Sequence, residues 1–157
     1  MGLILQQTNE GLLATDGIDF SLRYNGDLTD TIKFGYAIDG TWTNSNKFLA
    51  SPGGDNRECV GFFSVNCGSI QPEFSMSNRF TFTFDEIYNL SLRHRFISSV
   101  QQEPLDIIEN GEAFIGISPL FGQVDFTRIP AENYFDLSGQ WDISDNVAFT
   151  GNRSEPV

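Results

Sequence analysis

Positive charge is scarce in this chain of 157 residues. Nine Lys and Arg residues stand against 21 Asp and Glu residues, so the formal net charge is −12. A chain this acidic repels the phosphate backbone of nucleic acids. We therefore expect no nucleic-acid partner.

Long apolar runs are missing as well. No stretch of about 18 or more apolar residues occurs, so the sequence predicts no transmembrane helix. Residues 1–7 have neither a basic region nor an apolar run of the length of a secretory signal, which by itself predicts a cytoplasmic protein. A membrane-spanning strand needs only about 9 to 11 residues and leaves a weaker trace. Spanning strands therefore remain compatible with this sequence.

Cysteine and histidine are rare. Cys59 and Cys67 lie eight residues apart in a polar stretch, where they can close a small disulfide ring in an oxidising compartment; two separate thiols are the alternative. The single histidine, His94, is remote from both, which argues against zinc. No nucleophile, base and acid have a recognisable spacing. We expect no catalytic residue, no metal and no cofactor, and His94 is interpreted as an interface residue.

Strand-forming and turn-forming residues are plentiful instead. The chain has 15 Phe, 15 Gly and only two Met, with 39% hydrophobic residues. Phe and Thr favour strands, and Gly, Asn and Ser favour turns. The length fits one domain, 1–157. The composition therefore predicts an all-β chain.

Residues 78–96 show the clearest pattern, two alternating runs around a short turn at 85–87. Because successive strand side chains point to opposite faces, one face is apolar and the other polar. The apolar set is Phe80, Phe82, Phe84, Tyr88, Leu90, Leu92 and Phe96. The polar set is Arg79, Thr81, Thr83, Asn89, Ser91, Arg93 and Arg95. This predicts a hairpin between lipid and a water-filled lumen.

Two further hairpins have the same alternation. The first joins strands over 12–24 and 31–43 through a turn at 25–27. The second begins near residue 133, turns at 144–146, and places Phe135 and Leu137 opposite Asp136 and Gln140. The three hairpins predict an antiparallel meander of about six strands that forms part of a transmembrane β-barrel.

Two long polar stretches, 44–71 and 97–130, separate the hairpins. In the second, either 105–108 or 113–117 forms a helical turn or a short strand. Short and long connections thus alternate, which is typical of outer-membrane barrels. Contacts with a substrate are expected from the long loops, where Phe62 and Phe63 lie.

These patterns define three sets of candidate residues. The expected lipid-facing side chains are Phe80, Phe82, Leu90, Leu92, Phe135 and Leu137. The expected lumen-facing polar side chains are Arg79, Arg93, Arg95, Asp136 and Gln140. The aromatics expected at the lipid–water interfaces are Trp42, Trp141, Tyr36 and Tyr88, with packing in a soluble β-core as the alternative.

Several short motifs occur in an order that resembles a known family. They are Thr15–Asp19, Asp39–Trp42, Cys59–Gly68, Gln71–Phe74, Ile129–Leu137 and Asp145–Asn146. In this order the motifs resemble the C-terminal β-barrel region of TonB-dependent outer-membrane receptors. The resemblance covers most of the chain and depends on the combination of motifs.

The resemblance implies a 22-stranded barrel with an N-terminal plug in the outer membrane of a Gram-negative bacterium. It implies import of nutrients such as iron chelates, cobalamin or saccharides, energised by the TonB complex. The expected partners are outer-membrane lipid, the rest of the barrel and plug, the TonB complex through the parent receptor, and an unidentified small nutrient. Because 157 residues have room for about six spanning strands, we expect a fragment without the plug and the last strands.

A soluble antiparallel β-barrel or β-sandwich that binds a ligand is the alternative. It predicts that the apolar face packs against a second sheet or fills a small barrel. The membrane hypothesis predicts that this face contacts lipid. The surroundings of the apolar face therefore discriminate between the two.

Overall fold

The structure, a computed structural model, describes residues 11–49, 51–54, 56–64, 67, 70–103, 115–118, 122–125, 127–144 and 147–156. Every regular element in these ranges is a β-strand, which confirms the all-β prediction. None of the described residues belongs to a helix of the length and apolarity that crossing a membrane requires.

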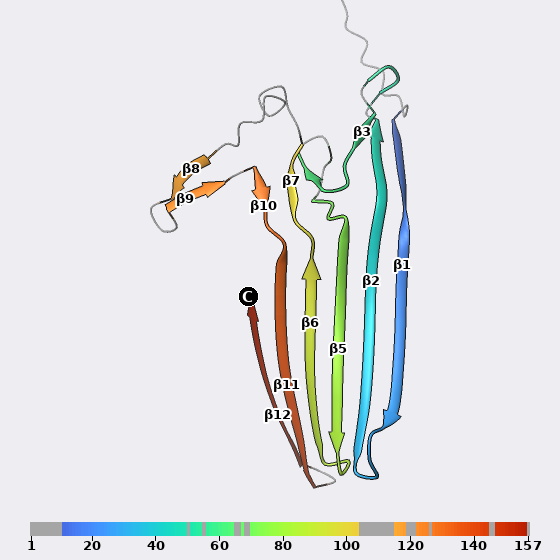
Figure 1. The fold of residues 1–157 in the computed structure, drawn as a ribbon, viewed down its shortest axis with the longest axis vertical. Helices are drawn as coiled ribbons and strands as arrows, with labels where there is room; N and C mark the ends of the chain where they lie inside the picture. The colour runs from blue at the N-terminus through green and yellow to red at the C-terminus, as the bar shows by residue number, and fades with distance from the viewer. Residues whose placement is uncertain are drawn as a thin grey trace, which may run out of the picture.

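One large sheet dominates the structure (Figure 1). Its six long strands are all antiparallel and follow one another from edge to edge, which confirms the predicted meander. They are β1 (Leu12–Asp27), β2 (Ile32–Leu49), β5 (Phe74–Phe84), β6 (Tyr88–Ile97), β11 (Glu132–Ser144) and β12 (Val147–Pro156). The short strand β3 (Arg57–Glu58) adds to the far end of β2. The sheet is not closed, because β1 and β12 lie at opposite edges.

Short and long connections alternate as predicted. Residues 28–31 join β1 to β2 and residues 85–87 join β5 to β6, while β11 and β12 are only two residues apart. The first two junctions lie together at the lower end of the sheet in Figure 1, where β11 also ends and β12 begins. The long connections, after β2 and after β6, leave from the opposite end. The sheet thus has one end with tight turns and one end with long loops.

The predicted turn at 25–27 is wrong. These residues continue β1, where Asn25, Gly26 and Asp27 are paired with residues 33–35 of β2. The chain reverses at 28–31 instead. There the backbone N–H of Thr29 donates to the carbonyl oxygen of Ile32 at 3.2 Å, and the Thr29 hydroxyl oxygen accepts from the backbone N–H of Ile32 at 3.0 Å. A threonine side chain that bonds nearby backbone can form a turn without glycine.

The second strand is also longer than predicted. It extends beyond Thr43 to Leu49, and a β-bulge near Asn44 shifts its register with β1 at Asp16 and Gly17. The polar residues after Thr43 are held by hydrogen bonds across the strands, since Asn44 donates to Asp16 at 2.7 Å and Thr15 donates to Asn46 at 3.0 Å. Part of the predicted loop 44–71 is therefore strand.

Two small sheets accompany the long loops. The first has the order β10 (Arg128–Ile129), β7 (Val100–Gln102) and β4 (Phe62–Phe63). The second pairs β8 (Ile115–Ser118) with β9 (Gly122–Asp125). Of the two segments considered in loop 97–130, residues 105–108 lie outside the described residues. In the other, residues 115–117 form part of β8, whereas 113–114 lie outside them.

The described residues have almost no apolar core. Their only buried hydrophobic residues are Cys59 and Val100, with 1% and 3% of their surface exposed. Both lie at the end with the long loops rather than on the large sheet. The described part of the chain has no second sheet packed over the large one, so it does not have the two layers of a sandwich.

Candidate functional site

The large sheet has one largely apolar face. The register pairs Phe34 with Phe82, Phe82 with Leu90, and Leu92 with Leu137, so apolar side chains stand side by side across the strands. Aromatic rings contact one another along these rows, with centroids 5.0 Å apart for Tyr36 and Phe80. The six expected lipid-facing residues all lie on this face. The face continues onto β12 at Phe149, which is paired with Trp141, and is interrupted there by Arg153, which is paired with Leu137.

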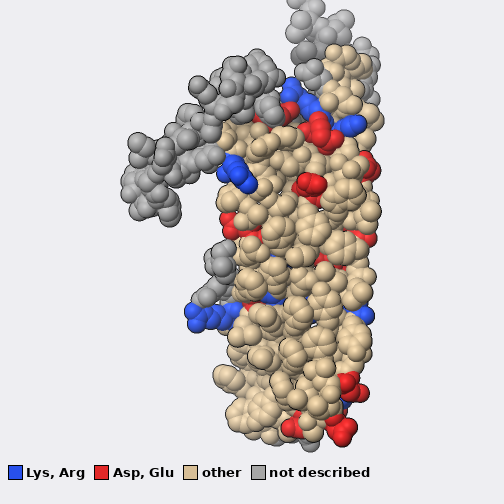
Figure 2. Space-filling view, viewed as in Figure 1, with Lys and Arg blue, Asp and Glu red and all other residues tan. Residues whose placement is uncertain are grey.

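In the middle of β6 and β11, exposure is the reverse of that in a water-soluble sheet. Leu90, Leu92, Phe135 and Leu137 are exposed, with 42% for Leu90 and 46% for Leu137. Their polar neighbours Ser91, Arg93, Asp136 and Ser138 are only partly exposed. In Figure 2, most Lys, Arg, Asp and Glu side chains lie at the ends and margins of the face in view, and few lie in its middle. In the middle of these two strands, the apolar side chains are thus more exposed than the polar ones.

Aromatic residues mark both ends of this face. Trp42 is paired with Phe74 near the long loops, and its indole N–H donates to Glu73 at 3.3 Å. Trp141 stacks on Tyr88 near the tight turns, with centroids 5.6 Å apart. Tyr36, expected at an interface, lies midway between these ends.

Four polar side chains form a hydrogen-bonded chain within the apolar face. The Tyr36 hydroxyl donates to Asn78 Oδ1 at 3.0 Å, and Asn78 Nδ2 lies 3.4 Å from His94 Nδ1. His94 Nε2 lies 2.9 Å from Asn133 Oδ1, and its ring stacks on Phe135. With Asn78 donating to Nδ1, the neutral imidazole donates through Nε2. His94 is therefore a link between polar partners on neighbouring strands.

The polar face carries an arginine row, defined as Arg23, Ala37, Arg79, Arg93 and Asp136. These five residues are direct partners from strand to strand across β1, β2, β5, β6 and β11. Arg79 and Arg93 are thus opposite one another. All five expected lumen-facing residues share this face.

Two acids pair with arginines on this face. Arg23 Nη2 donates to both carboxylate oxygens of Asp39, at 2.8 and 2.9 Å. Arg95 Nη2 lies 3.1 Å from Asp136, and its guanidinium lies 5.3 Å from the centre of the Tyr134 ring. Gln140, the remaining expected residue, donates to Asp142 at 2.7 Å.

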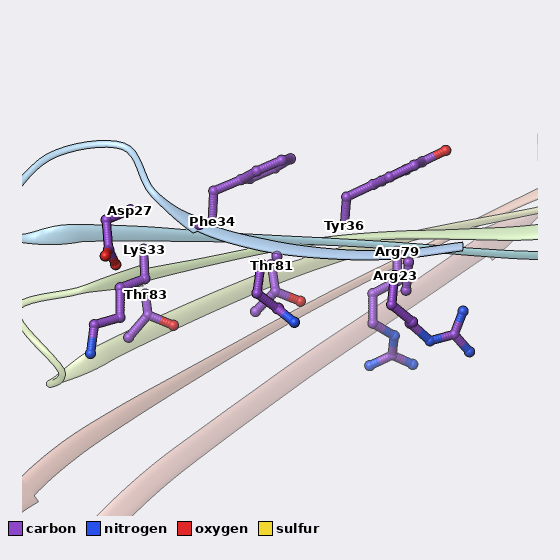
Figure 3. Close-up of a pocket in the computed structure, with 12 residues that line it drawn as sticks. Arg23, Asp27, Lys33, Phe34, Tyr36, Arg79, Thr81 and Thr83 are labelled. Atoms are coloured by element: carbon purple, nitrogen blue, oxygen red, sulfur yellow. The ribbon is translucent and has the colours of Figure 1, made fainter. Parts of the chain in front are cut away.

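Arg79 lies between two hollows in the polar face. One, of about 370 Å³, surrounds Gly35 and is shown in Figure 3. There Arg23, Lys33, Arg79, Thr81 and Thr83 lie on one side of the sheet, and Phe34 and Tyr36 point to the other side. The second hollow, of about 300 Å³, is lined by Arg79, Arg93, Asp136, Ser138 and Asn152.

The loop end is held together by a disulfide and a carboxylate. Cys59 and Cys67, the pair proposed from the sequence, form a disulfide. Burial raises the pKa of the neighbouring Glu58, but hydrogen bonds from the Asn46 amide, the Ser45 hydroxyl and the Val60 amide outweigh it, so the pKa lies below its usual value. This carboxylate fixes β3 against the end of β2.

Sequence reasoning missed two features of these faces. It did not connect Arg23 with Arg79 and Arg93, because the connection depends on the register across four strands, β1, β2, β5 and β6. It also treated His94 as isolated, although Asn78, its direct partner on β5, and Asn133, diagonally opposite it on β11, interrupt the apolar alternation. Such interruptions on neighbouring strands are the signal that identifies the polar chain.

The comparisons with known proteins found no match: no family model, no curated protein and no solved structure matches this chain. Membership of the TonB-dependent receptor family therefore stays a prediction from the motifs. Within the described ranges, no group of three or more His, Cys, Asp or Glu side chains is arranged to hold a metal ion.

Proposed function

We propose that the large sheet is part of the wall of an outer-membrane β-barrel, and that the chain is part of a TonB-dependent receptor that imports small nutrients. The observation that carries the membrane placement is the reversed exposure of β6 and β11. Barrels of this kind expose apolar side chains to lipid and turn polar ones towards a wet lumen. The receptor assignment rests on the motif order.

The height of the apolar face agrees with a bilayer. The aromatic row at Trp42 and Phe74 is ten residues along β5 from Phe84, which is paired with Tyr88 and so lies in the row of Trp141. At a rise of about 3.4 Å per residue and a tilt of about 40°, ten residues span about 26 Å. The apolar band of outer-membrane barrels is about 25 Å tall between two aromatic girdles.

The open edges also fit a barrel wall. Unpaired backbone groups cost several kcal/mol each in hydrocarbon, so a sheet in lipid must have its edges paired. In the proposed barrel, further strands pair with the outer edges of β1 and β12. The nutrient then enters through the end with the long loops, in keeping with the short periplasmic turns of such barrels.

Two adjacent residues give the most direct test. Trp42 and Trp141 are the only tryptophans, so the double variant Trp42→Phe/Trp141→Phe has no tryptophan fluorescence. In this background, Phe82→Trp or Thr81→Trp introduces a single tryptophan. The full chain is reconstituted, at a concentration at which copies can pair their open edges, in vesicles whose phosphatidylcholine carries bromine on the acyl chains. We expect strong bromine quenching of fluorescence for Phe82→Trp and weak quenching for Thr81→Trp, because these neighbours point to opposite faces.

Quenching by aqueous iodide provides the control and should have the reverse order. Equal bromine quenching of the two variants, or none of either, contradicts the membrane placement. Nutrient uptake is tested separately, by asking whether a receptor that contains this segment restores growth on a scarce iron chelate, cobalamin or saccharide. Growth that is unaffected by the receptor on each of these nutrients contradicts the transport assignment.

A further inference from the structure

The centre of the polar face has more positive charge than its own acids neutralise. Four arginines, Arg23, Arg79, Arg93 and Arg95, lie in two successive cross-strand rows with two acids, Asp39 and Asp136. Asp39 forms an ion pair with Arg23, and Asp136 forms an ion pair with Arg95. Two positive charges therefore remain, on Arg79 and Arg93, in a chain whose net charge is −12.

These two arginines are incompletely bonded within the described part of the chain. The guanidinium of Arg79 has no hydrogen-bond or ion-pair partner there, and Arg93 donates only from Nε, to Ser77 at 3.0 Å. Like charges placed opposite one another on neighbouring strands destabilise a sheet. A bound anion would offset this repulsion, because a guanidinium forms paired hydrogen bonds with carboxylate or phosphate oxygens.

Space for such an anion is present in the second hollow, of about 300 Å³, which is lined by both Arg79 and Arg93. The two hollows, of about 370 and 300 Å³, share Arg79 in their linings. The side-chain amide of Asn152 lines the second hollow as well and can donate to the anion, and the Thr81 hydroxyl lines the first. Figure 3 shows Arg79 on the same side of the sheet as Arg23 and Lys33.

We infer that Arg79 and Arg93 form an oxyanion site for a carboxylate or phosphate group, which bridges the two guanidinium groups. That this anion is met in a barrel lumen rests on the proposed function, whereas binding itself requires only the sheet. The anion comes either from a small solute in the lumen or from an acidic segment of protein within it. The chemistry of recognition is the same in both cases.

The test measures binding to the full chain in detergent micelles by titration calorimetry. Citrate is the small-anion probe, and a peptide of eight glutamates is the segment probe, with eight glutamines as its control. We expect saturable binding of one of the two acidic probes, weakened about tenfold or more by Arg79→Gln or Arg93→Gln. Citrate binding identifies a solute site, and binding of the peptide alone identifies a segment site.

Arg23→Gln is the matched control, because it removes one charge from the same row but from an arginine already held by Asp39. It should weaken binding less than Arg79→Gln. Without an anion, Arg79→Gln should also raise the melting temperature of the chain, since it removes the repulsion from Arg93. This separates lost binding from lost folding.

The inference is overturned if neither acidic probe binds, or if Arg79→Gln and Arg23→Gln weaken binding equally. The tryptophan-quenching experiment tests the membrane placement separately. If citrate binding depends on Arg79 but Phe82→Trp is not quenched by bromine, the oxyanion site is supported and the barrel placement is contradicted.

Discussion

At the residue scale, two residues in the turn between β5 and β6 adopt a left-handed backbone conformation, which glycine adopts most easily. Asp85 and Glu86 have φ angles of 49° and 59°. The left-handed region costs an L-residue roughly 1–2 kcal/mol, although short polar residues such as Asp tolerate it better. The alternation of apolar and polar residues in β5 and β6 predicts a turn between them. The positive φ angles arise because only three residues join the two strands.

Asp85→Gly should therefore stabilise the sheet by about 0.5–1 kcal/mol, because glycine adopts the left-handed region without strain. The same change at Thr83, in the extended part of β5, should destabilise it by a similar amount. Urea midpoints of the detergent-solubilised variants measure both effects. A loss of stability for Asp85→Gly would contradict the strain assigned to this turn.

Glu58 gives a pH dependence at the loop end. Its pKa is lowered in the folded chain, so its ionised form contributes stability that is complete above the unfolded-state pKa, near pH 4.3. This contribution is lost as the pH falls from that value through the lower folded-state pKa. The amides of Asn46 and Val60, which donate to the carboxylate, should then exchange hydrogen faster.

The measurement is amide exchange at these two positions, corrected for intrinsic rates, between about pH 6 and 3. Glu58→Gln should show faster exchange throughout and no additional increase in acid. Exchange that increases equally in the variant and the parent would show that another group is responsible.

At the element scale, two glycines on the apolar face have opposite surroundings. A Cβ at Gly40 of β2 would overlap the ring of Phe20, which lies over it from β1, whereas a Cβ at Gly139 of β11 would meet no atom within 4 Å. Aromatic rings on a neighbouring strand can shield a glycine in this way. Sequence alone does not distinguish the two glycines.

Gly40→Ala should thus destabilise the sheet by about 1–3 kcal/mol, because Phe20 must move. Gly139→Ala should be neutral or stabilising by about 0.5–1 kcal/mol, because it restricts the unfolded chain. Denaturation in micelles compares the two variants directly. Equal effects would mean that Phe20 does not cover Gly40.

The sequence was most informative where each strand alternates without interruption. The β5–β6 hairpin could be predicted nearly residue by residue, because Phe80, Phe82, Leu90 and Leu92 set its faces. The 28–31 turn could not, because Asn25 and Gly26 carry a stronger turn signal than the threonine that makes the real one. The arginine row and the His94 chain depend on register between strands, which local pattern does not contain.

At the scale of the whole molecule, 39% hydrophobic residues coexist with two buried hydrophobic residues in the described ranges. Water-soluble domains are stabilised mainly by burying apolar surface against protein. Here the large sheet offers its apolar face outward instead. The proposed lipid contact supplies the missing apolar surroundings.

Phe82→Arg tests this directly. It should cost about 2–4 kcal/mol of folding free energy in vesicles if the side chain lies near the bilayer midplane, since a charge there must be withdrawn from water. Thr81→Arg, one residue away on the polar face, should cost less than about 1 kcal/mol. Guanidinium-induced unfolding from vesicles gives both values, and similar costs for the two changes would count against lipid contact.

The outer side of β1 has a consequence for how the chain is produced. Within the described part of the chain, sixteen consecutive residues there lack a neighbour on one side, and about half of their amide and carbonyl groups point that way. Such a border attracts any extended peptide, including another newly made copy, before the intended neighbour arrives. Without the neighbouring strand of the proposed barrel, this border favours association between copies of the chain.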